Sequence, residues 1–292
     1  MLNNPKADIF CDIPCALGEG PGYDPSTQTV WWFDILAGKL LEKAYPDGVA
    51  RVHDLGVMAS AMAIIDAERQ LLVTERGLLV RNRKTGRLTD HLPIEADNPR
   101  TRSNDARVHP SGAFWIGTMG KKAEQGAGSI YWYRGGELRL LYPDITITNS
   151  ICFSPDGCVA YFADTDKNIV WRVDTDPEKG LPTSTPAIFL EHRGIGGVDG
   201  SVVDRDGNLW NARWGAGSVD CYSPEGKHVR SVAVPATQAS CPAFVGPNGN
   251  RLAVTSAREG LTTKALAETP LAGQTFLIDL PVKGRFDPPV RL

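Results

Sequence analysis

The chain has 292 residues with a formal net charge of -3, 42% hydrophobic residues and 22% charged residues. This balance is typical of a globular protein, and it shows no basic or acidic excess that would indicate nucleic acid or an anionic membrane as a partner. The longest apolar stretches are strand-sized, far below the roughly 20 residues that span a bilayer. Residues 1–6 contain no apolar run of a signal peptide, so we expect a cytoplasmic protein with reduced thiols.

A polar turn followed by a short apolar or aromatic strand recurs six times. The turns begin, in chain order, at Asp24, Asp66, His109, Ser154, Asp204 and Gly246. They are 42 to 50 residues apart, which is close to the period of four-stranded propeller blades. Pro, Asp, Asn and Gly favour such turns because they preset φ, bond the local backbone or accept positive φ. We therefore predict one domain over residues 1–292, an all-β, six-bladed β-propeller with four-stranded antiparallel blades around a central channel.

The two ends of the chain carry the remaining predicted elements. A strand near residues 7–10 should complete the last blade beside a strand near residues 275–278, which closes the ring and removes exposed sheet edges. The best helical candidate is a single turn at residues 264–268. Two β-sandwiches are the alternative architecture, but a repeat that keeps its phase along the whole chain favours the propeller.

The repeat also predicts which side chains line the channel, because equivalent positions of different blades occupy equivalent places around one axis. Counting back five residues from each turn gives Glu19, Ala61, Asn104, Asn149, Asp199 and Cys241. Four of the six carry side-chain oxygens, and polar groups that meet in a narrow channel need a partner. Such oxygens suit Ca²⁺, Mg²⁺ or Mn²⁺. No histidine falls at a ring position, which argues against a three-histidine zinc site, although zinc accepts oxygen ligands. The alternative is that each residue caps a strand end.

A second set of equivalent positions follows each turn by ten residues. It comprises Asp34, Arg76, Met119, Asp164, Trp214 and Ser256. We expect several of these to face the mouth of the pocket, with Arg102 reaching in beside Asn104. For Asp34 and Asp164, bonding to backbone donors at a blade corner is an equal alternative, and for Trp214 packing is the favoured one.

The sequence resembles the gluconolactonase, regucalcin (senescence marker protein) and luciferin-regenerating enzyme superfamily. The matching segments are residues 17–21, 104–105 with 117–119, 147–150 and 199–204. Residues 207–210 with 214–215, and residues 257–261 with 270–273, are similar to bacterial sugar lactonases. The resemblance implies that Glu19, Asn149 and Asp199 bind one divalent metal, which could be Ca, Zn, Mn, Mg or Fe. It implies that Arg102 and Asn104 bind substrate, the latter directly or through a water on the metal.

Three positions depart from the family pattern. Ser150 replaces the usual glycine after the metal-binding Asn, and Val198 replaces the usual proline before the channel Asp. Lys122, in the loop at residues 120–128, aligns with a Glu that contacts substrate in animal relatives. Lys122 is therefore a further predicted substrate-binding residue, and the departure bears on which substrate is used.

Together these features predict a metal-dependent hydrolase of sugar lactones, meaning aldono-1,4- or 1,5-lactones such as glucono-, xylono-, arabino- or galactonolactone. The metal would act as a Lewis acid on the lactone carbonyl, and Asp199 would accept the proton of the attacking water as the catalytic base. The sequence contains no GxSxG nucleophile motif. Alternatives are a phosphotriesterase-like or strictosidine-synthase-like propeller enzyme and a non-catalytic calcium-binding propeller. The sugar, the metal and the oligomeric state stay open.

Overall fold

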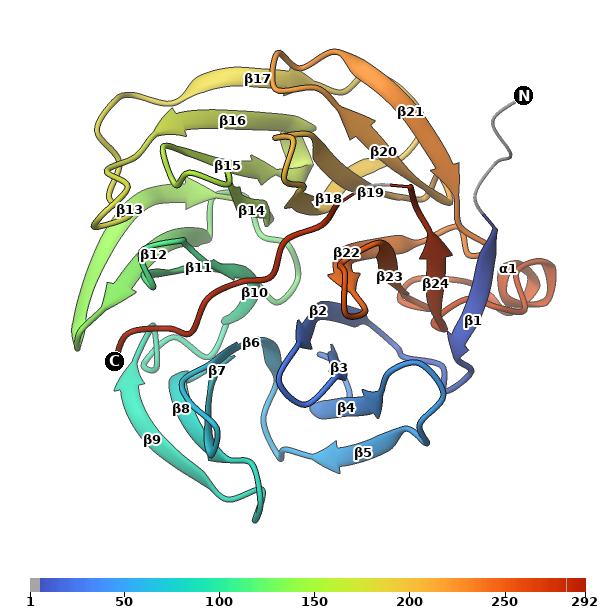
Figure 1. Ribbon diagram of the computed structural model, residues 1–292, viewed down its shortest axis with the longest axis horizontal. Helices are drawn as coiled ribbons and strands as arrows, with labels where there is room; N and C mark the ends of the chain where they lie inside the picture. The colour runs from blue at the N-terminus through green and yellow to red at the C-terminus, as the bar shows by residue number, and fades with distance from the viewer. Residues whose placement is uncertain (1–5, 282) are drawn as a thin grey trace. The chain divides into compact units, whose positions relative to one another are not determined.

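The computed structural model describes residues 6–281 and 283–292. Residues 1–5 lie outside this range. They are most of the segment on which the expectation of no signal peptide depends. The described residues form 24 strands, one 3-10 helix and one short α-helix, and the strands make six four-stranded antiparallel sheets (Figure 1). This architecture is the six-bladed β-propeller that the repeat predicts. No helix in the described part of the chain is both long and apolar enough to cross a membrane.

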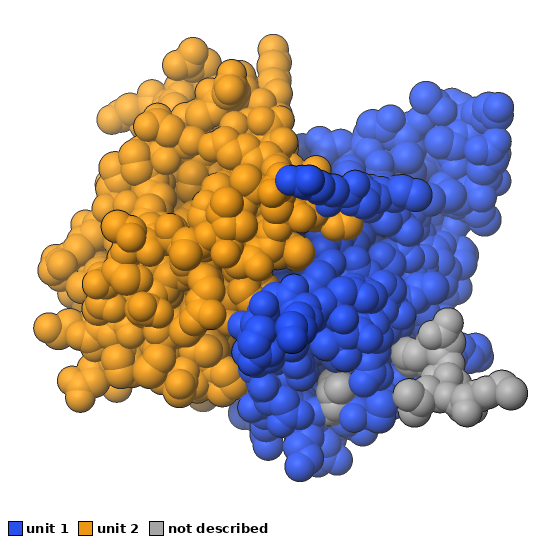
Figure 2. All heavy atoms as spheres, turned by 90° about the horizontal axis from the view of Figure 1, so that it is seen from above, with its two compact units in different colours: residues 1–54, 193–286 blue, residues 55–192, 287–292 orange. Residues whose placement is uncertain are grey.

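The chain divides into two compact units (Figure 2). Each unit contains three of the six sheets. Unit 1 comprises residues 1–54 and 193–286, and unit 2 comprises residues 55–192 and 287–292. The prediction of one domain over residues 1–292 stays a prediction.

Unit 1 contains the first blade and the last two blades of the chain. The first blade consists of β2 (Gly18–Asp24), β3 (Thr29–Asp34), β4 (Lys39–Ala44) and β5 (Arg51–Asp54). The fifth blade consists of β18 (Gly197–Val203), β19 (Leu209–Trp214), β20 (Ser218–Tyr222) and β21 (His228–Ala233). The last blade consists of β22 (Ala239–Val245), β23 (Arg251–Ser256), β24 (Thr275–Asp279) and β1 (Ala7–Cys11). The strand β1 pairs with β24, with Ala7 opposite Ile278, which confirms the predicted closure of the last blade. The helix α1 (Thr263–Glu268) confirms the predicted helical turn.

Unit 2 contains the three middle blades. Its sheets are β6 (Ala59–Ile64), β7 (Arg69–Thr74), β8 (Gly77–Asn82) and β9 (Leu88–Pro93); β10 (Thr101–Val108), β11 (Phe114–Gly120), β12 (Gly128–Arg134) and β13 (Glu137–Ile145); and β14 (Thr148–Phe153), β15 (Val159–Asp164), β16 (Ile169–Asp174) and β17 (Ala187–Glu191). The 3-10 helix η1 (Thr165–Lys167) follows β15.

The predicted turns join the first and second strands of the blades. In the fifth blade, Asp204 Oδ1 accepts hydrogen bonds from the backbone N–H groups of Asp206 (3.0 Å) and Asn208 (2.9 Å). Gly207 in the same turn has φ of +83°, a conformation that glycine adopts without a steric penalty. The local chemistry of the turn therefore sets where the second strand begins.

Each unit has its own apolar core between adjacent blades. In unit 1, Trp210 and Phe276 belong to one cluster and Trp32 to another. In unit 2, Phe114 and Trp115 belong to two separate clusters. Because successive strand residues point to opposite faces, each blade buries side chains on both faces, and this packing fixes the positions of the innermost strands.

All six innermost strands contain one extra residue relative to the strand beside them. In β2 the pairing register shifts between Glu19 and Gly22, and in β18 it shifts between Val198 and Ser201. The strands β6, β10, β14 and β22 show the same irregularity at matching places. Such bulges bend a strand and re-aim its side chains. Every predicted ring position lies at or within one of these shifts, so the residues expected to carry the chemistry sit where the backbone departs from a regular ladder.

Candidate functional site

Three of the predicted site residues form a buried hydrogen-bonded series in unit 2. Arg102 Nη1 donates to Asn104 Oδ1 (2.7 Å) and to the Ser103 carbonyl (2.9 Å). Asn104 Nδ2 donates to Asn149 Oδ1 (3.2 Å) and to the Thr148 carbonyl (2.7 Å). The strands β10 and β14 thus bring Arg102, Asn104 and Asn149 together, as the sequence predicts for neighbouring blades.

A residue that the sequence analysis does not single out fixes the orientation of Asn149. Asn149 Nδ2 donates to Thr165 Oγ1 (2.8 Å), at the start of η1. With its nitrogen held by Thr165, the amide presents Oδ1 on the side of Asn104. A carbonyl oxygen has two lone pairs, and the bond from Asn104 uses one, so Asn149 Oδ1 can still bind a cation.

A buried carboxylate joins the same two strands. Asp105 Oδ2 accepts a hydrogen bond from the Ile151 backbone N–H (2.7 Å), and the side chain is buried. Burial raises the pKa of Asp105 to about 6, although the positive charge of Arg107 and the backbone hydrogen bonds lower it in part. Asp105 therefore lies next to the substrate-binding candidate Asn104 while acting as a clamp between β10 and β14.

Glu19 and Asp199 lie in unit 1, and both are buried. Glu19 Oε2 accepts a hydrogen bond from the Gly20 backbone N–H (3.0 Å), and Gly20 has φ of +54°. The Asp199 carbonyl accepts a hydrogen bond from Asn211 Nδ2 (2.8 Å). Buried carboxylates need compensating partners or a bound cation. Carboxylate oxygens on innermost strands are of the ligand type that a divalent cation prefers, and the joint coordination by Glu19, Asn149 and Asp199 stays a prediction.

Asp34 and Asp164 act on the backbone just before two of these ligand candidates. Asp34 accepts from the N–H groups of Ala16 (2.8 Å) and Leu17 (3.1 Å), three and two residues before Glu19. Asp164 accepts from the N–H groups of Thr146 (3.2 Å) and Ile147 (3.0 Å), three and two residues before Asn149. The structure thus shows both residues in the backbone-bonding role that the sequence left as an equal alternative to substrate contact.

The first and fourth blades also share the backbone conformation of the residue that follows the proposed metal ligand. Gly20 follows Glu19 with φ of +54°, and Ser150 follows Asn149 with φ of +56°. Ser150, which replaces the usual glycine, therefore has the same left-handed backbone conformation as Gly20. This conformation is sterically less favourable for Ser150, because its Cβ lies close to the following carbonyl oxygen. Glu19 and Asn149 consequently emerge from the same local backbone geometry.

The remaining residues that were predicted to face the pocket or bind substrate differ from one another in exposure and in contacts. Arg76 and Lys122 are exposed, and the Lys122 backbone N–H donates to Glu124 Oε2 (3.1 Å) within the loop at residues 120–128. Met119 is buried, and Ser256 Oγ donates to the Gln274 carbonyl (2.7 Å). Trp214 is half-buried and forms an isolated bridge with Gln238. A shared role in substrate contact for these residues stays a prediction.

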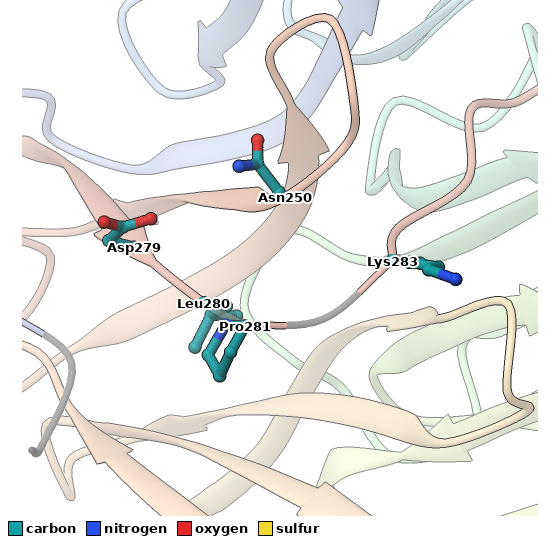
Figure 3. Close-up of a pocket in the computed structure, with 5 residues that line it drawn as sticks. All are labelled: Asn250, Asp279, Leu280, Pro281 and Lys283. Atoms are coloured by element: carbon teal, nitrogen blue, oxygen red, sulfur yellow. The ribbon is translucent and has the colours of Figure 1, made fainter. Parts of the chain in front are cut away.

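Two further observations concern possible ligand sites among the described residues. A pocket of about 370 Å³ in unit 1 is lined by Asn250, Asp279, Leu280, Pro281 and Lys283 (Figure 3), and none of these is a predicted site residue. Among the described residues, no group of three or more His, Cys, Asp and Glu side chains is placed to hold a metal ion. The predicted ligand set has only two such side chains, because its third member is Asn149.

Comparison with known proteins identifies the family. The family described as the SMP-30/Gluconolactonase/LRE-like region matches residues 17–258. The chain belongs to this family. This result confirms the resemblance that the sequence motifs show.

Members of the SMP-30/gluconolactonase family resemble the chain along nearly its whole length. This chain is 50% identical to a protein of Rhizobium meliloti (strain 1021) that is provisionally named a sugar lactone lactonase. The alignment spans 277 residues, which are 94% of each of the two chains. This chain is 36% identical over 277 residues to the L-arabinolactonase of Azospirillum brasilense, covering 93% of this chain and 91% of that one. The crystal structure of a calcium-binding protein, regucalcin, from Agrobacterium tumefaciens superposes with a TM-score of 0.97 at 49% identity and covers 99% of this chain and 98% of that one.

Proposed function

We propose that this protein is an enzyme that hydrolyses a sugar lactone, an aldono-1,4- or 1,5-lactone, to the aldonic acid with the help of one divalent cation. The observation that carries the proposal is the similarity, over more than nine-tenths of the chain, to family members named for sugar lactones. The buried series from Arg102 to Asn149 supports it, because it supplies oriented polar groups between two neighbouring innermost strands.

Glu19, Asn149 and Asp199 are the proposed metal ligands. Two carboxylates and one amide oxygen form a hard donor set, which favours Ca²⁺, Mg²⁺ or Mn²⁺. The name of the solved relative refers to calcium binding, so Ca²⁺ is the first cation to test. A divalent cation bound there supplies Lewis-acid polarisation of the lactone carbonyl.

The other proposed roles follow from side-chain chemistry. Asp199 supplies a carboxylate that acts as the catalytic base and accepts the proton of the attacking water. Asn104 and Arg102 bind the substrate, and the planar guanidinium of Arg102 suits the carboxylate that ring opening creates. Lys122 contacts the substrate from the loop at residues 120–128.

Carboxylate-to-amide variants test the metal site. Asp199→Asn and Glu19→Gln keep side-chain size but remove charge, so each should lower kcat/KM for a good lactone substrate by at least about 100-fold, equivalent to roughly 3 kcal/mol of transition-state stabilisation. The matched control is Asp206→Asn, an exposed residue of the turn after β18. Unchanged kcat/KM in both site variants, with circular dichroism showing intact folds, would contradict the proposed ligands.

A substrate panel tests the reaction itself. A pH-indicator assay over γ- and δ-aldonolactones, corrected for spontaneous ring opening, should show hydrolysis that a chelator abolishes and a single added cation restores. Aryl phosphotriesters serve as the competing substrates. Turnover of phosphotriesters alone, or cation binding without hydrolysis of any lactone, would replace the proposal with one of the alternatives for this fold.

A further inference from the structure

Asn211 in unit 1 is a buried polar residue at a strand position where the other blades have an apolar or aromatic residue. Asn211 lies in the second strand of the fifth blade, opposite Ser201, the first residue paired after the bulge of β18. In the other five blades, the residue that pairs first after the bulge is Trp31, Val73, Ile116, Tyr161 or Val254. The blade that carries Asp199 is therefore the one blade with an amide at this apolar position.

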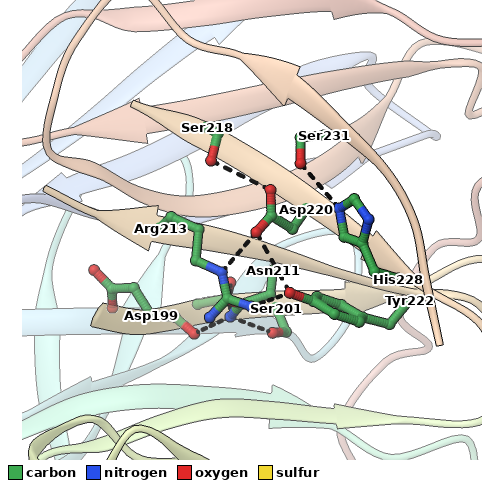
Figure 4. Close-up of polar contacts among 10 residues, drawn as sticks. Asp199, Ser201, Asn211, Arg213, Ser218, Asp220, Tyr222, His228 and Ser231 are labelled. Atoms are coloured by element: carbon green, nitrogen blue, oxygen red, sulfur yellow. Dashed lines mark hydrogen bonds and ion pairs between the residues drawn. The ribbon is translucent and has the colours of Figure 1, made fainter. Parts of the chain in front are cut away.

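The amide of Asn211 is directed at the bulge itself. Its Nδ2 donates to the carbonyl of Asp199 (2.8 Å), to the carbonyl of Gly200 (3.3 Å) and to Ser201 Oγ (2.9 Å) (Figure 4). Asn211 is 0% exposed. A fully buried amide costs free energy unless it is hydrogen-bonded, and here its donors go to three consecutive residues that begin with Asp199.

A second contact restricts the same bulge from the neighbouring blade of unit 1. A Cβ atom placed on Gly200 would lie 2.3 Å from Cys241 Sγ, so the backbone of β18 is in close contact with β22 at this point. The bulge is consequently held by hydrogen bonds from β19 and by packing from β22. Its conformation, which determines where the Asp199 side chain points, is set by these two neighbours.

We infer that Asn211 is a positioning residue that fixes the direction of the Asp199 side chain through the backbone of the β18 bulge. This inference rests on the proposed function, in which Asp199 is a metal ligand and the catalytic base. Asn211 itself contacts neither the cation nor the substrate. Its loss should weaken cation binding and slow turnover, because partners that orient a metal ligand typically contribute 10- to 100-fold to metal affinity or activity.

The test compares Asn211→Leu and Asn211→Asp with the wild-type protein. Leu has a similar volume and no donor. Asp has nearly the same shape and replaces the two N–H donors by one carboxyl group, which donates at most one hydrogen bond when protonated and none when ionised. Both variants should bind Ca²⁺ 10- to 100-fold more weakly by isothermal titration calorimetry. Both should also show kcat lowered at least 10-fold with KM changed by less than 3-fold, because the substrate-binding residues are untouched. If the Leu variant does not fold, the isosteric Asp variant decides.

Tyr222→Phe is the matched control. Tyr222 lies in the same blade, where its hydroxyl bonds with Arg213 and donates to Asp220 Oδ2 (3.4 Å) (Figure 4). Removing this buried hydroxyl destabilises the blade without touching the bulge, so Ca²⁺ affinity and kcat should stay within 2-fold. Equal losses in Tyr222→Phe and the Asn211 variants, or unchanged affinity and kcat in the latter, would overturn the inference and leave the proposed function standing. A wild-type protein that neither binds a cation nor hydrolyses a lactone would instead refute the proposed function, and the inference with it.

Discussion

Asp105 shows how a single buried carboxylate couples the candidate site to the stability of unit 2. Its Oδ2 accepts the Ile151 N–H across two innermost strands, and Arg107 on the same strand forms an ion pair with Asp287 (3.1 Å). Burial raises the pKa of Asp105 from 3.8 to about 6. The charged form is therefore less favourable in the folded protein than in the unfolded chain.

The raised pKa predicts a specific pH dependence of stability. Because the folded-state pKa of Asp105 exceeds its unfolded value, its contribution to stability is fully present below pH 3.8 and is lost as pH rises through about 6. Asp105→Asn keeps a carbonyl oxygen for the Ile151 N–H and cannot ionise. Its free energy of unfolding relative to wild type should therefore increase by on the order of 3 kcal/mol between pH 3.8 and pH 7.

Urea denaturation in the presence of a chelator measures this difference, with the exposed Asp97→Asn as the control. The control should show no comparable trend over the same pH range. A pH-independent difference between Asp105→Asn and wild type would mean that the carboxylate is charged in the fold at pH 5 and has an ordinary pKa.

At the scale of the strand, Asp34 and Asp164 each accept two backbone hydrogen bonds from the segment that precedes a proposed metal ligand, Glu19 or Asn149. Asp164→Ala should remove the acceptor of the buried Thr146 N–H and the half-buried Ile147 N–H, and so lower the free energy of unfolding by about 2 kcal/mol. Asp34→Ala should have a similar effect on its own blade. The exposed neighbour Asp166→Ala is the control, and urea denaturation with an unchanged m-value is the measurement. A loss within 0.5 kcal/mol of the control would show that water satisfies these donors.

The repeat explains why so much of this organisation could be predicted. Each turn uses local chemistry, so six turns in phase predict six blades, and the closing pair of β1 with β24 follows from the count. The pairing of Asn104 with Asn149 also follows, because equivalent positions of adjacent blades meet. The offset of five residues from each turn is a purely local count, and it identifies the bulged position in every innermost strand.

The bonds that orient these side chains could not be predicted in the same way. Thr165 and Asp105 act across blades, and nothing in their sequence neighbourhood indicates the partner. The role of Asp34 and Asp164 stayed ambiguous because an Asp at a blade corner serves a backbone donor or a ligand equally well. Asn211 did leave a signal, since the other five repeats place an apolar or aromatic residue at its position, but that comparison requires the register of the second strand.

At the scale of the whole molecule, the last six residues complete unit 2, although the segment before them belongs to unit 1. Val290 packs into the core cluster that contains Phe114 and Tyr133, and its backbone N–H donates to the Ile64 carbonyl (2.8 Å). Arg291 bonds through its backbone to Gly112 (2.9 Å) and Gly135 (3.0 Å). These contacts make residues 287–292 an integral part of the second and third blades.

Val290→Ala should therefore lower the free energy of unfolding by about 1 to 2 kcal/mol, because it removes buried methyl groups and leaves a small cavity. Removal of residues 287–292 should have a larger effect, since it also takes away the backbone hydrogen bonds and the Asp287 partner of Arg107. Leu292→Ala is the matched control at the same terminus, because Leu292 is 37% exposed, and it should change stability by less than 0.5 kcal/mol. Urea denaturation compares the three proteins with wild type. If the truncated chain were as stable as the wild type, the tail would rest on the surface without supporting the core, and its burial of Val290 would contribute nothing to folding.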